Sequence, residues 1–375
     1  MTTVSIFNNK GGVGKTTLTF HLGWILSEMG KKVIFVDLDP QCNLTLHSMT
    51  EGNLESIWSE EEPFIESYGD EREIHPTKLD ELAKEPRSIH FLLKPAEDGV
   101  DSLNELPPLI EVSENLWLLP GRLSLHQYEG RLAQSDARVL TNEYDSVRVV
   151  SELRTIIDSY AKQYSADLVL IDTSPSLGML NKYAISFSDA FFSPTSPDIF
   201  SAYALKNIGV ALRRWSSWFN SMHNVLNQRA KNKLPKQFVK FIGYAVYNAR
   251  RAGKGGNDLN NLARAHRRYY DILESVVESS IPKEFRIDYE GIEKGVNEEV
   301  MFTHNTFPAM AQALKCPMWL APDKAKDRQD TLESLEIPKP QGSHIQNMRE
   351  TRAQYKNFAI EFLKRVEVVE AENVG

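Results

Sequence analysis

Short apolar runs alternate with longer amphipathic stretches along much of the chain. The apolar runs predict strands near residues 2–7, 33–37, 115–119, 167–171, 189–193 and 238–246. Over residues 16–29, apolar side chains recur on one face, which predicts a helix. Residues 168–171 are all apolar, which is typical of a strand buried on both faces of a parallel sheet. The alternation therefore predicts an α/β fold with a mostly parallel twisted sheet flanked by helices.

The glycine-rich turn after the first strand indicates a phosphate site. Residues 8–17 are NNKGGVGKTT, and a strand, a glycine-rich turn and a helix in this order form the context of a P-loop. Backbone N–H groups at the start of such a helix hold phosphate oxygens. Lys15 would then reach the β- and γ-phosphates, and the Thr16 hydroxyl would ligate Mg²⁺. The pattern G-x-x-x-x-G-K-[ST] is met except at its first position, where Asn9 stands.

Aspartates follow two of the other predicted strands. Asp37 and Asp39 close the strand in VDLDPQ, and Asp172 follows residues 168–171. Parallel α/β sheets bind their ligands at the carboxyl ends of the strands. We therefore expect these three carboxylates to lie near the glycine-rich loop.

The string KGGVGKTT resembles the deviant Walker A motif, KGGxGK[ST], of the ParA/MinD family of ATPases. The resemblance implies a P-loop NTPase of the deviant Walker A type, with insertions, that binds ATP and Mg²⁺. The residues that it assigns to nucleotide binding are Gly11, Gly12, Val13, Gly14, Lys15, Thr16, Thr17 and, at the end of the strand near 238–246, Asn248. Asn248 would read the adenine edge, or it is a simple turn residue.

The same resemblance assigns catalytic roles to Lys10, Lys15 and Asp39. Lys10 matches the signature lysine, which crosses a dimer interface to the phosphates of the partner's nucleotide. A cation supplied in this way stabilises charge that develops on the γ-phosphoryl oxygens. Asp39 matches the aspartate that positions or activates the attacking water.

The resemblance also implies a metal site formed by Thr16, Asp37 and Asp172. Asp172 is similar to the Walker B aspartate, and Asp37 to a carboxylate near the metal. The family pattern after the Walker B aspartate is D-x-P-P, and Ser174 stands at its first proline.

Charge and length predict the domain organisation. We expect a P-loop ATPase domain at 1–320, with an acidic insertion at about 49–110 and a basic helical insertion at about 213–237. Residues 321–375 would form a C-terminal tail and closing helix. Residues 51–114 carry 18 acidic and 5 basic side chains, which is typical of a solvated surface, or else of a docking face for a basic partner.

Residues 201–290 have the opposite balance, with 16 basic and 7 acidic side chains in a chain of net charge −8. This asymmetry indicates an anionic partner, and the resemblance implies nonspecific DNA bound by the ATP-bound dimer. Basic residues scattered over a surface are the plain alternative. The clusters are Arg213-Arg214, Arg229-Lys231-Lys233, Arg250-Arg251-Lys254 and Arg264-Arg267-Arg268.

The sequence predicts a cytoplasmic protein, because it begins directly with a strand, contains no apolar run of membrane-spanning length and has only two cysteines. The function implied by the resemblance is that of a ParA-type switch. ATP would bring two chains together as a homodimer, and hydrolysis to ADP and phosphate, stimulated by a ParB-like partner, would drive DNA segregation or cargo positioning. DNA binding would make the protein nucleoid-associated.

Three alternatives remain at this point. A MinD-like membrane-associated positioning ATPase would need a basic amphipathic tail, whereas the end of this chain is acidic, with Glu367, Glu370 and Glu372. We therefore expect a closing helix there. A P-loop metabolic synthetase would use ATP to activate a carboxylate. A nonenzymatic binding module would have a decayed site, yet the key lysine, threonine and aspartates are all present.

Overall fold

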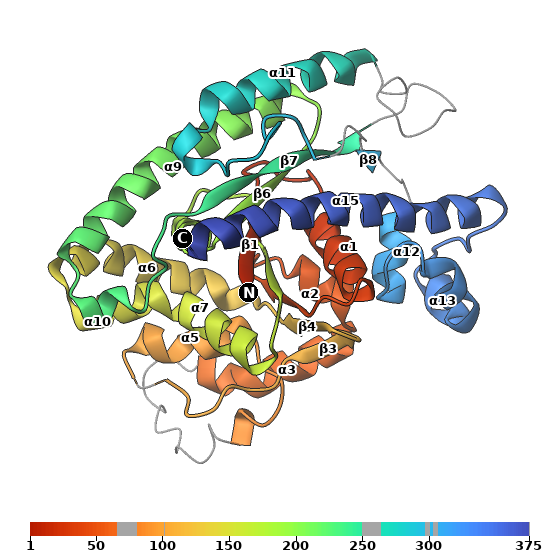
Figure 1. The fold of residues 1–375 in the computed structure, drawn as a ribbon. Helices are drawn as coiled ribbons and strands as arrows, with labels where there is room; N and C mark the ends of the chain where they lie inside the picture. Colours follow the sequence, from red (N-terminus) through yellow and green to blue (C-terminus); the bar gives the residue numbers. More distant parts are fainter. Residues whose placement is uncertain (66–80, 101, 250–263, 297–300, 303–306, 375) are drawn as a thin grey trace.

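The strands of the protein form one sheet in a computed structural model that describes residues 1–65, 81–100, 102–249, 264–296, 301–302 and 307–374 (Figure 1). Within these residues, the sheet has eight strands in the order β3-β4-β2-β5-β1-β6-β7-β8. Neighbouring strands are parallel except for the antiparallel pair β3 and β4. The strands are β1 Thr2–Ile6, β2 Val33–Asp37, β3 Ile110–Ser113, β4 Leu116–Leu119, β5 Leu168–Asp172, β6 Ala190–Thr195, β7 Lys240–Ala249 and β8 Met301–Phe302.

The predicted α/β class is confirmed, and each of the six predicted strands is present. The pattern missed β3 and β8. The first is a half-exposed four-residue edge strand and the second has two residues, so neither provides an apolar run long enough to recognise.

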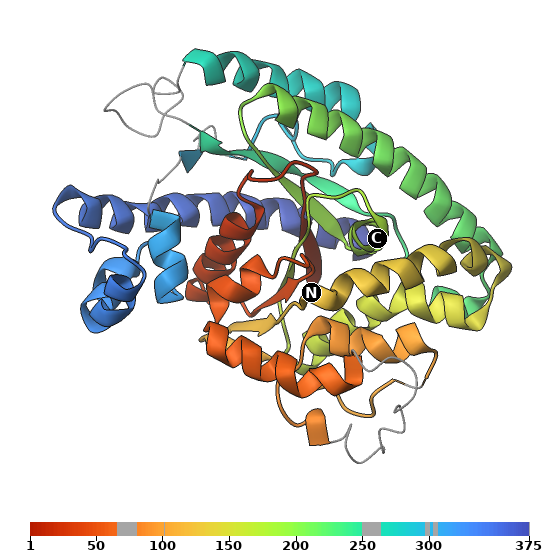
Figure 2. The ribbon, with the colours of Figure 1, turned by 180° about the vertical axis from the view of Figure 1, so that it is seen from behind.

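Helices cover both faces of the sheet (Figures 1 and 2). The α-helices of the described residues are α1 Lys15–Glu28, α2 Asn43–Ser48, α3 Glu51–Ile65, α5 Ile89–Asp98, α6 His126–Arg138, α7 Tyr144–Gln163, α8 Met179–Ser186, α9 Ile199–Val225, α10 Gln228–Lys231, α11 Arg264–Ser280, α12 Phe307–Leu314, α13 Ala321–Asp327, α14 Gln329–Ser334 and α15 Ser343–Val374. The described residues also include the short 3₁₀ helices η1 Leu123–Leu125, η2 Val139–Thr141 and η4 Lys283–Phe285.

Successive side chains of the central strands point to opposite faces of the sheet, so the core is divided into clusters on the two faces. In β2, Val33 and Phe35 pack into the cluster that contains α1 and α15, whereas Ile34 and Val36 pack into the cluster that contains α7. Successive side chains of a strand point to opposite faces, so a strand covered on both sides must be apolar throughout. A third cluster joins β6 and β7 to α9 and α11.

The C-terminal helix α15 lies against α1 along one face of the sheet (Figure 1). Its apolar residues Met348, Tyr355, Phe358 and Phe362 are buried in the core cluster of that face. The apolar face of this helix is therefore packed against the sheet and is not available to a membrane. None of the described helices is both long and apolar enough to cross a bilayer.

The acidic segment is only partly the solvated surface that its composition predicts. Glu51 and Glu55 of α3 are exposed, but Ile89, Phe91 and Leu93 of α5 are buried in the core cluster on the α7 side. The number of acidic residues in the segment gives no sign of this apolar face, because most of those residues lie outside α5. Residues 66–80 and 101 lie outside the described part of the chain, and the insertion boundaries stay a prediction.

We expect Phe362→Ala to lower the free energy of unfolding by about 3–5 kcal/mol, because it opens a cavity where α15 meets the sheet. Urea unfolding measures this change. The control is Ile360→Ala in the same helix, whose side chain is exposed, and there we expect a change within about 0.5 kcal/mol. Equal effects of the two substitutions would contradict the packing of α15 as a core helix.

Candidate nucleotide-binding site

The loop between β1 and α1 has the backbone of a phosphate-binding turn. Gly12 and Gly14 have φ values of 73° and 85°, in the left-handed region that glycine adopts without a Cβ clash. Gly14 is the N-cap of α1, so the first N–H groups of the helix begin there. Asn8 holds the base of the loop: its side chain donates to Pro194 O at 2.9 Å and accepts from the Lys10 N–H at 2.9 Å.

A cavity of about 500 Å³ opens over this loop. This volume lies in the range of small-molecule and cofactor sites. The residues that line it are Gly11, Gly12, Gly14, Lys15, Thr16, Thr17, Asp39, Gln41, Asn43, His47, Pro175, Tyr247 and Pro308. Six of the seven loop residues predicted to bind nucleotide line this cavity, and the exception is Val13, whose side chain is buried. Their role in binding stays a prediction.

Two carboxylates lie side by side beneath the cavity. Asp37 and Asp172 are register partners at the ends of β2 and β5, and both are fully buried. Asp172 Oδ2 accepts from Thr16 Oγ1 at 2.6 Å. Burial raises the pKa of Asp172 to about 8, and the neighbouring Asp37 adds to this rise. Burial also raises the pKa of Asp37 to about 7 against the hydrogen bonds from Thr45.

The charge of Lys15 is close to these acids. Burial lowers the pKa of the Lys15 ammonium, while Asp172 and Asp39 act in the opposite direction. Its Nζ donates to the Lys10 carbonyl at 3.5 Å. Lys15 is therefore a buried basic side chain in the wall of the cavity, next to the loop carbonyl of Lys10.

The oxygen donors of Thr16 and Asp172 suit Mg²⁺, which prefers hard oxygen ligands. Asp37 is less available, because its oxygens accept from Thr45 N at 2.8 Å, Thr45 Oγ1 at 2.7 Å and Asp39 N at 3.2 Å. The described residues contain no cluster of three or more His, Cys, Asp or Glu that could hold a metal ion.

Asp39 lies at the wall of the cavity, and only 7% of its surface is exposed. One of its oxygens, Oδ1, accepts from the Gln41 N–H at 3.0 Å, which fixes the carboxylate after the turn. A carboxylate oriented in this way can accept a hydrogen bond from a water molecule in the cavity.

Lys10 does not line the cavity of its own chain. Its ammonium pairs with Asp198, the N-cap residue of α9, and lies 3.5 Å from Ser201 Oγ. Large apolar side chains beside it are exposed at the start of α9, including Ile199, Phe200 and Tyr203. The two lysines of the loop thus occupy different places: Lys15 under the phosphate site and Lys10 beside an exposed apolar surface.

Comparison with known proteins agrees with this geometry. A family model described as an AAA domain matches residues 1–223, more than half of the chain. The chain belongs to this family. It is 30% identical over 201 residues to the uncharacterized protein MJECL24 of Methanocaldococcus jannaschii, a match that covers 54% of this chain and 61% of that protein.

The relatives also include ParA proteins. The virulence plasmid ParA family protein pGP5-D of Chlamydia psittaci is 28% identical over 209 residues, which cover 56% of this chain and 62% of the relative. The structure of pNOB8 ParA shares the fold over 98% of both chains, with a TM-score of 0.55 and 17% identity. The predicted ParA/MinD type of P-loop protein is therefore confirmed. The chain spans between 47% and 62% of the length of the curated relatives that it matches.

Sequence reasoning missed Tyr247, which forms one wall of the site in this AAA domain protein. Its ring packs on Gly14 so closely that a Cβ at residue 14 would overlap it. Its hydroxyl is 2.7 Å from that of Tyr355 in α15, whose ring stacks on His21 of α1 with centroids 4.9 Å apart. The only signal for it in the sequence is that Tyr247, an aromatic residue with a polar hydroxyl, stands in a largely apolar strand. Asn248, the predicted adenine contact, follows it in β7, but its side chain lies outside the described part.

We expect Tyr355→Phe to lower the free energy of unfolding by about 1–3 kcal/mol, because the Tyr247 hydroxyl would remain buried without a partner. Nucleotide affinity should fall with it, since Tyr247 packs on the loop. The double variant Tyr247→Phe/Tyr355→Phe removes both hydroxyls and should recover most of both losses. Urea unfolding and nucleotide titration measure the cycle. If the losses of stability and affinity in the two single variants simply add in the double variant, a functional link through this pair is contradicted. The control is Tyr203→Phe, at an exposed position.

Proposed function

We propose that the protein is an ATP-dependent dimerising switch ATPase of the ParA type. The observation that carries the proposal is the position of Lys10. Lys15, Thr16 and Asp39 line the cavity of one chain, and the buried Asp172 accepts a hydrogen bond from Thr16. Lys10 does not line this cavity. A lysine that the motif requires, but that does not reach its own cavity, is suited to a phosphate supplied by a second chain.

In this proposal each residue has one task. Lys15 and the N–H groups at the start of α1 hold the β- and γ-phosphates. Thr16 and Asp172 hold Mg²⁺, which neutralises charge on the phosphate oxygens. Asp39 orients the attacking water, and Lys10 of the second chain stabilises the charge that develops on the γ-phosphoryl group. Each site is complete only in a homodimer, so ATP binding and dimerisation are coupled.

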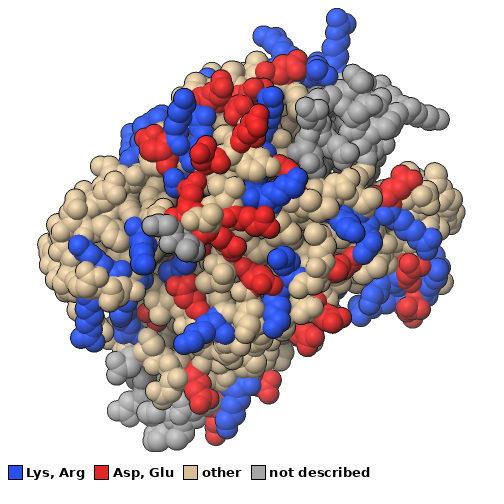
Figure 3. Space-filling model, viewed as in Figure 1, with Lys and Arg blue, Asp and Glu red and all other residues tan. Residues whose placement is uncertain are grey.

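The surface of α9 and α11 supports DNA as the matrix of the switch. These two helices pack against each other, and each carries exposed arginines, Arg213 and Arg214 on α9 and Arg264, Arg267 and Arg268 on α11. Basic side chains project beside α11 at the top of Figure 3. Arg250, Arg251 and Lys254 lie outside the described residues.

Nonspecific DNA binding needs only phosphate contacts, which such a surface can supply. A structure of pNOB8 ParA bound to nonspecific DNA shares the fold with 17% identity and a TM-score of 0.51, which by itself carries over the fold alone. A ParB-like partner that stimulates hydrolysis, and a cytoplasmic, nucleoid-associated location, belong to the same proposal. The MinD-like alternative is disfavoured because the apolar face of α15 is buried. A metabolic synthetase would be distinguished from this switch because it would hydrolyse ATP only when a carboxylate substrate is present.

The test of the trans role mixes two inactive chains. Lys10→Ala should bind ATP through its own Lys15 and Thr16 but lose hydrolysis, and Lys15→Ala should fail to bind ATP. In a mixture, the Lys15→Ala chain lends its Lys10 to the intact P-loop of the other chain. We expect hydrolysis to recover in part, up to about half the sites of a normal dimer, because one of the two composite sites of each mixed dimer is whole. A phosphate-release assay at high protein concentration measures it.

The control is Asp39→Ala, which should bind ATP and dimerise but hydrolyse poorly and stay locked. Normal hydrolysis by Lys10→Ala alone would show that this lysine is not a trans-acting catalytic residue. Wild-type ATP affinity in Lys15→Ala would overturn the P-loop assignment.

For DNA, we expect Arg267→Glu/Arg268→Glu to weaken binding of the ATP-bound protein while dimerisation persists. The slope of log affinity against log salt should fall by about 1 for each phosphate contact removed. DNA co-sedimentation with ATP, with ADP and without nucleotide measures it. A charge-matched control is Lys84→Glu/Lys356→Glu, two exposed lysines elsewhere. A wild-type protein that binds no DNA with ATP at low salt would show that another matrix is used.

A further inference from the structure

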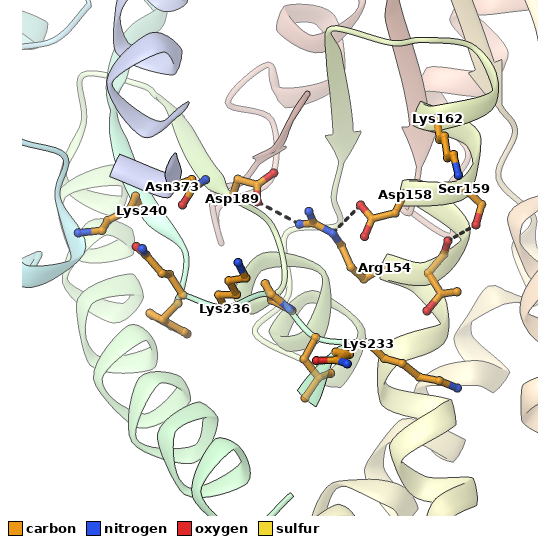
Figure 4. Close-up of a pocket in the computed structure, with 15 residues that line it drawn as sticks. Arg154, Asp158, Ser159, Lys162, Asp189, Lys233, Lys236, Lys240 and Asn373 are labelled. Atoms are coloured by element: carbon orange, nitrogen blue, oxygen red, sulfur yellow. Dashed lines mark hydrogen bonds and ion pairs between the residues drawn. The ribbon is translucent and has the colours of Figure 1, made fainter. Parts of the chain in front are cut away.

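A second hollow lies at the opposite ends of the parallel strands from the nucleotide cavity. Its volume is about 580 Å³, and it shares no lining residue with that cavity (Figure 4). It includes Asp189, just before β6, and Lys240, the first residue of β7, whereas the P-loop follows the carboxyl end of β1. The C-terminal part of α7, residues 232–238 and Asn373 of α15 complete the walls.

Lysine and arginine dominate the charged groups of this hollow. Its lining has five basic side chains, Arg154, Lys162, Lys233, Lys236 and Lys240, and two acidic ones, Asp158 and Asp189. Figure 4 shows Arg154 between the two aspartates, with Lys162 and Lys236 on either side of this group. The formal charge of the lining is therefore +3.

Both acids are already engaged. Arg154 Nε lies 2.8 Å from Asp158 Oδ1, and Arg154 Nη1 lies 3.2 Å from Asp189 Oδ1. The other oxygen of Asp189 accepts from the Thr3 N–H at 2.8 Å. Arg154 also donates to the Phe187 carbonyl at 2.6 Å, which fixes it to the protein. Because both carboxylates are paired with Arg154, the lysines determine the sign of the electrostatic potential in the hollow.

Three of the four lysines have no carboxylate partner among the described residues. Lys240 pairs with Glu372 at 3.4 Å, but no ion pair joins Lys162, Lys233 or Lys236 to an acid in that part of the chain. Lys233 lies over the Tyr144 ring, 5.6 Å from its centroid. Lys162 and Lys236 are exposed, so a ligand can reach them. A concave wall of one sign of charge concentrates anions more strongly than the same charges on a convex surface.

We propose that this hollow binds a small oligophosphate anion, such as inorganic tripolyphosphate or the phosphate chain of a nucleotide. The ammonium groups supply the counter-charge, and the side-chain amides of Asn232 and Gln237 in the lining supply neutral donors. The volume accommodates a mononucleotide-sized ligand but not a duplex. The ligand would join α7, the segment before β7 and the end of α15. The site does not depend on the P-loop and stands whether or not the switch function is correct.

The test uses tripolyphosphate as the probe and the full chain as the protein. Isothermal titration of Lys15→Ala, in which the P-loop is weakened, should still show one binding event. Adding Lys162→Glu/Lys236→Glu should weaken that event about tenfold or more, because two attractive charges become repulsive. The control pair Lys84→Glu/Lys356→Glu on the same background changes the net charge equally and should leave the affinity within about twofold.

The two sources of clustered phosphate are distinguished in a parallel titration with duplex DNA. Loss of tripolyphosphate binding with unchanged DNA binding supports the small-anion site. Loss of DNA binding alone would show that the hollow belongs to a DNA surface and would overturn the proposal. Equal weakening by the control pair, or no weakening by Lys162→Glu/Lys236→Glu, would also overturn it. Circular dichroism and unfolding curves confirm that each variant is folded, and both exchanged side chains are exposed.

Discussion

The two buried carboxylates, Asp37 and Asp172, constrain everything around the site. They end neighbouring strands in direct register, where burial raises both pKa values. Charged groups without water must be paired or hydrogen-bonded, because desolvation disfavours the ionised form. The groups that meet this need come from different segments: Thr16 and Lys15 from α1, and Thr45 from α2. The mutual position of the loop, α1 and α2 follows from these contacts.

The same arrangement supports the proposal that the site binds a nucleotide with a metal ion. Burial and the neighbouring Asp37 raise the pKa of Asp172, and a cation near Asp172 would favour its ionised carboxylate. Thr45 also accepts from the Gly121 N–H at 2.9 Å, so the acids are linked to the segment after β4. On the other side, Tyr247 connects the loop to α15. The cavity is therefore held by elements from both ends of the chain.

Charge is distributed over the molecule in three separate settings. The buried acids lie at the carboxyl ends of the strands, the basic hollow lies at their amino ends, and the arginines of α9 and α11 form an exposed surface. Figure 3 shows acidic side chains over the middle of one face and basic ones toward its left edge, the side on which Figure 1 places α10. A low overall net charge of −8 thus conceals local fields of opposite sign, and each would act on a different ligand.

The sequence by itself determined the sheet and the loop, and it predicted the site residues near that loop. Apolar runs and a glycine-rich turn are local patterns, because strand burial and the left-handed φ of Gly12 and Gly14 depend on residues close in the chain. Only the tertiary structure decided which distant residues complete the site. Tyr247, Tyr355 and the Asp198 partner of Lys10 are separated from the loop by about 190 to 340 positions, and no local period links them. The hollow was equally hidden, since its lysines come from α7 and from the segment before β7. Their charges act together only because the strands between them bring those segments to one edge of the sheet.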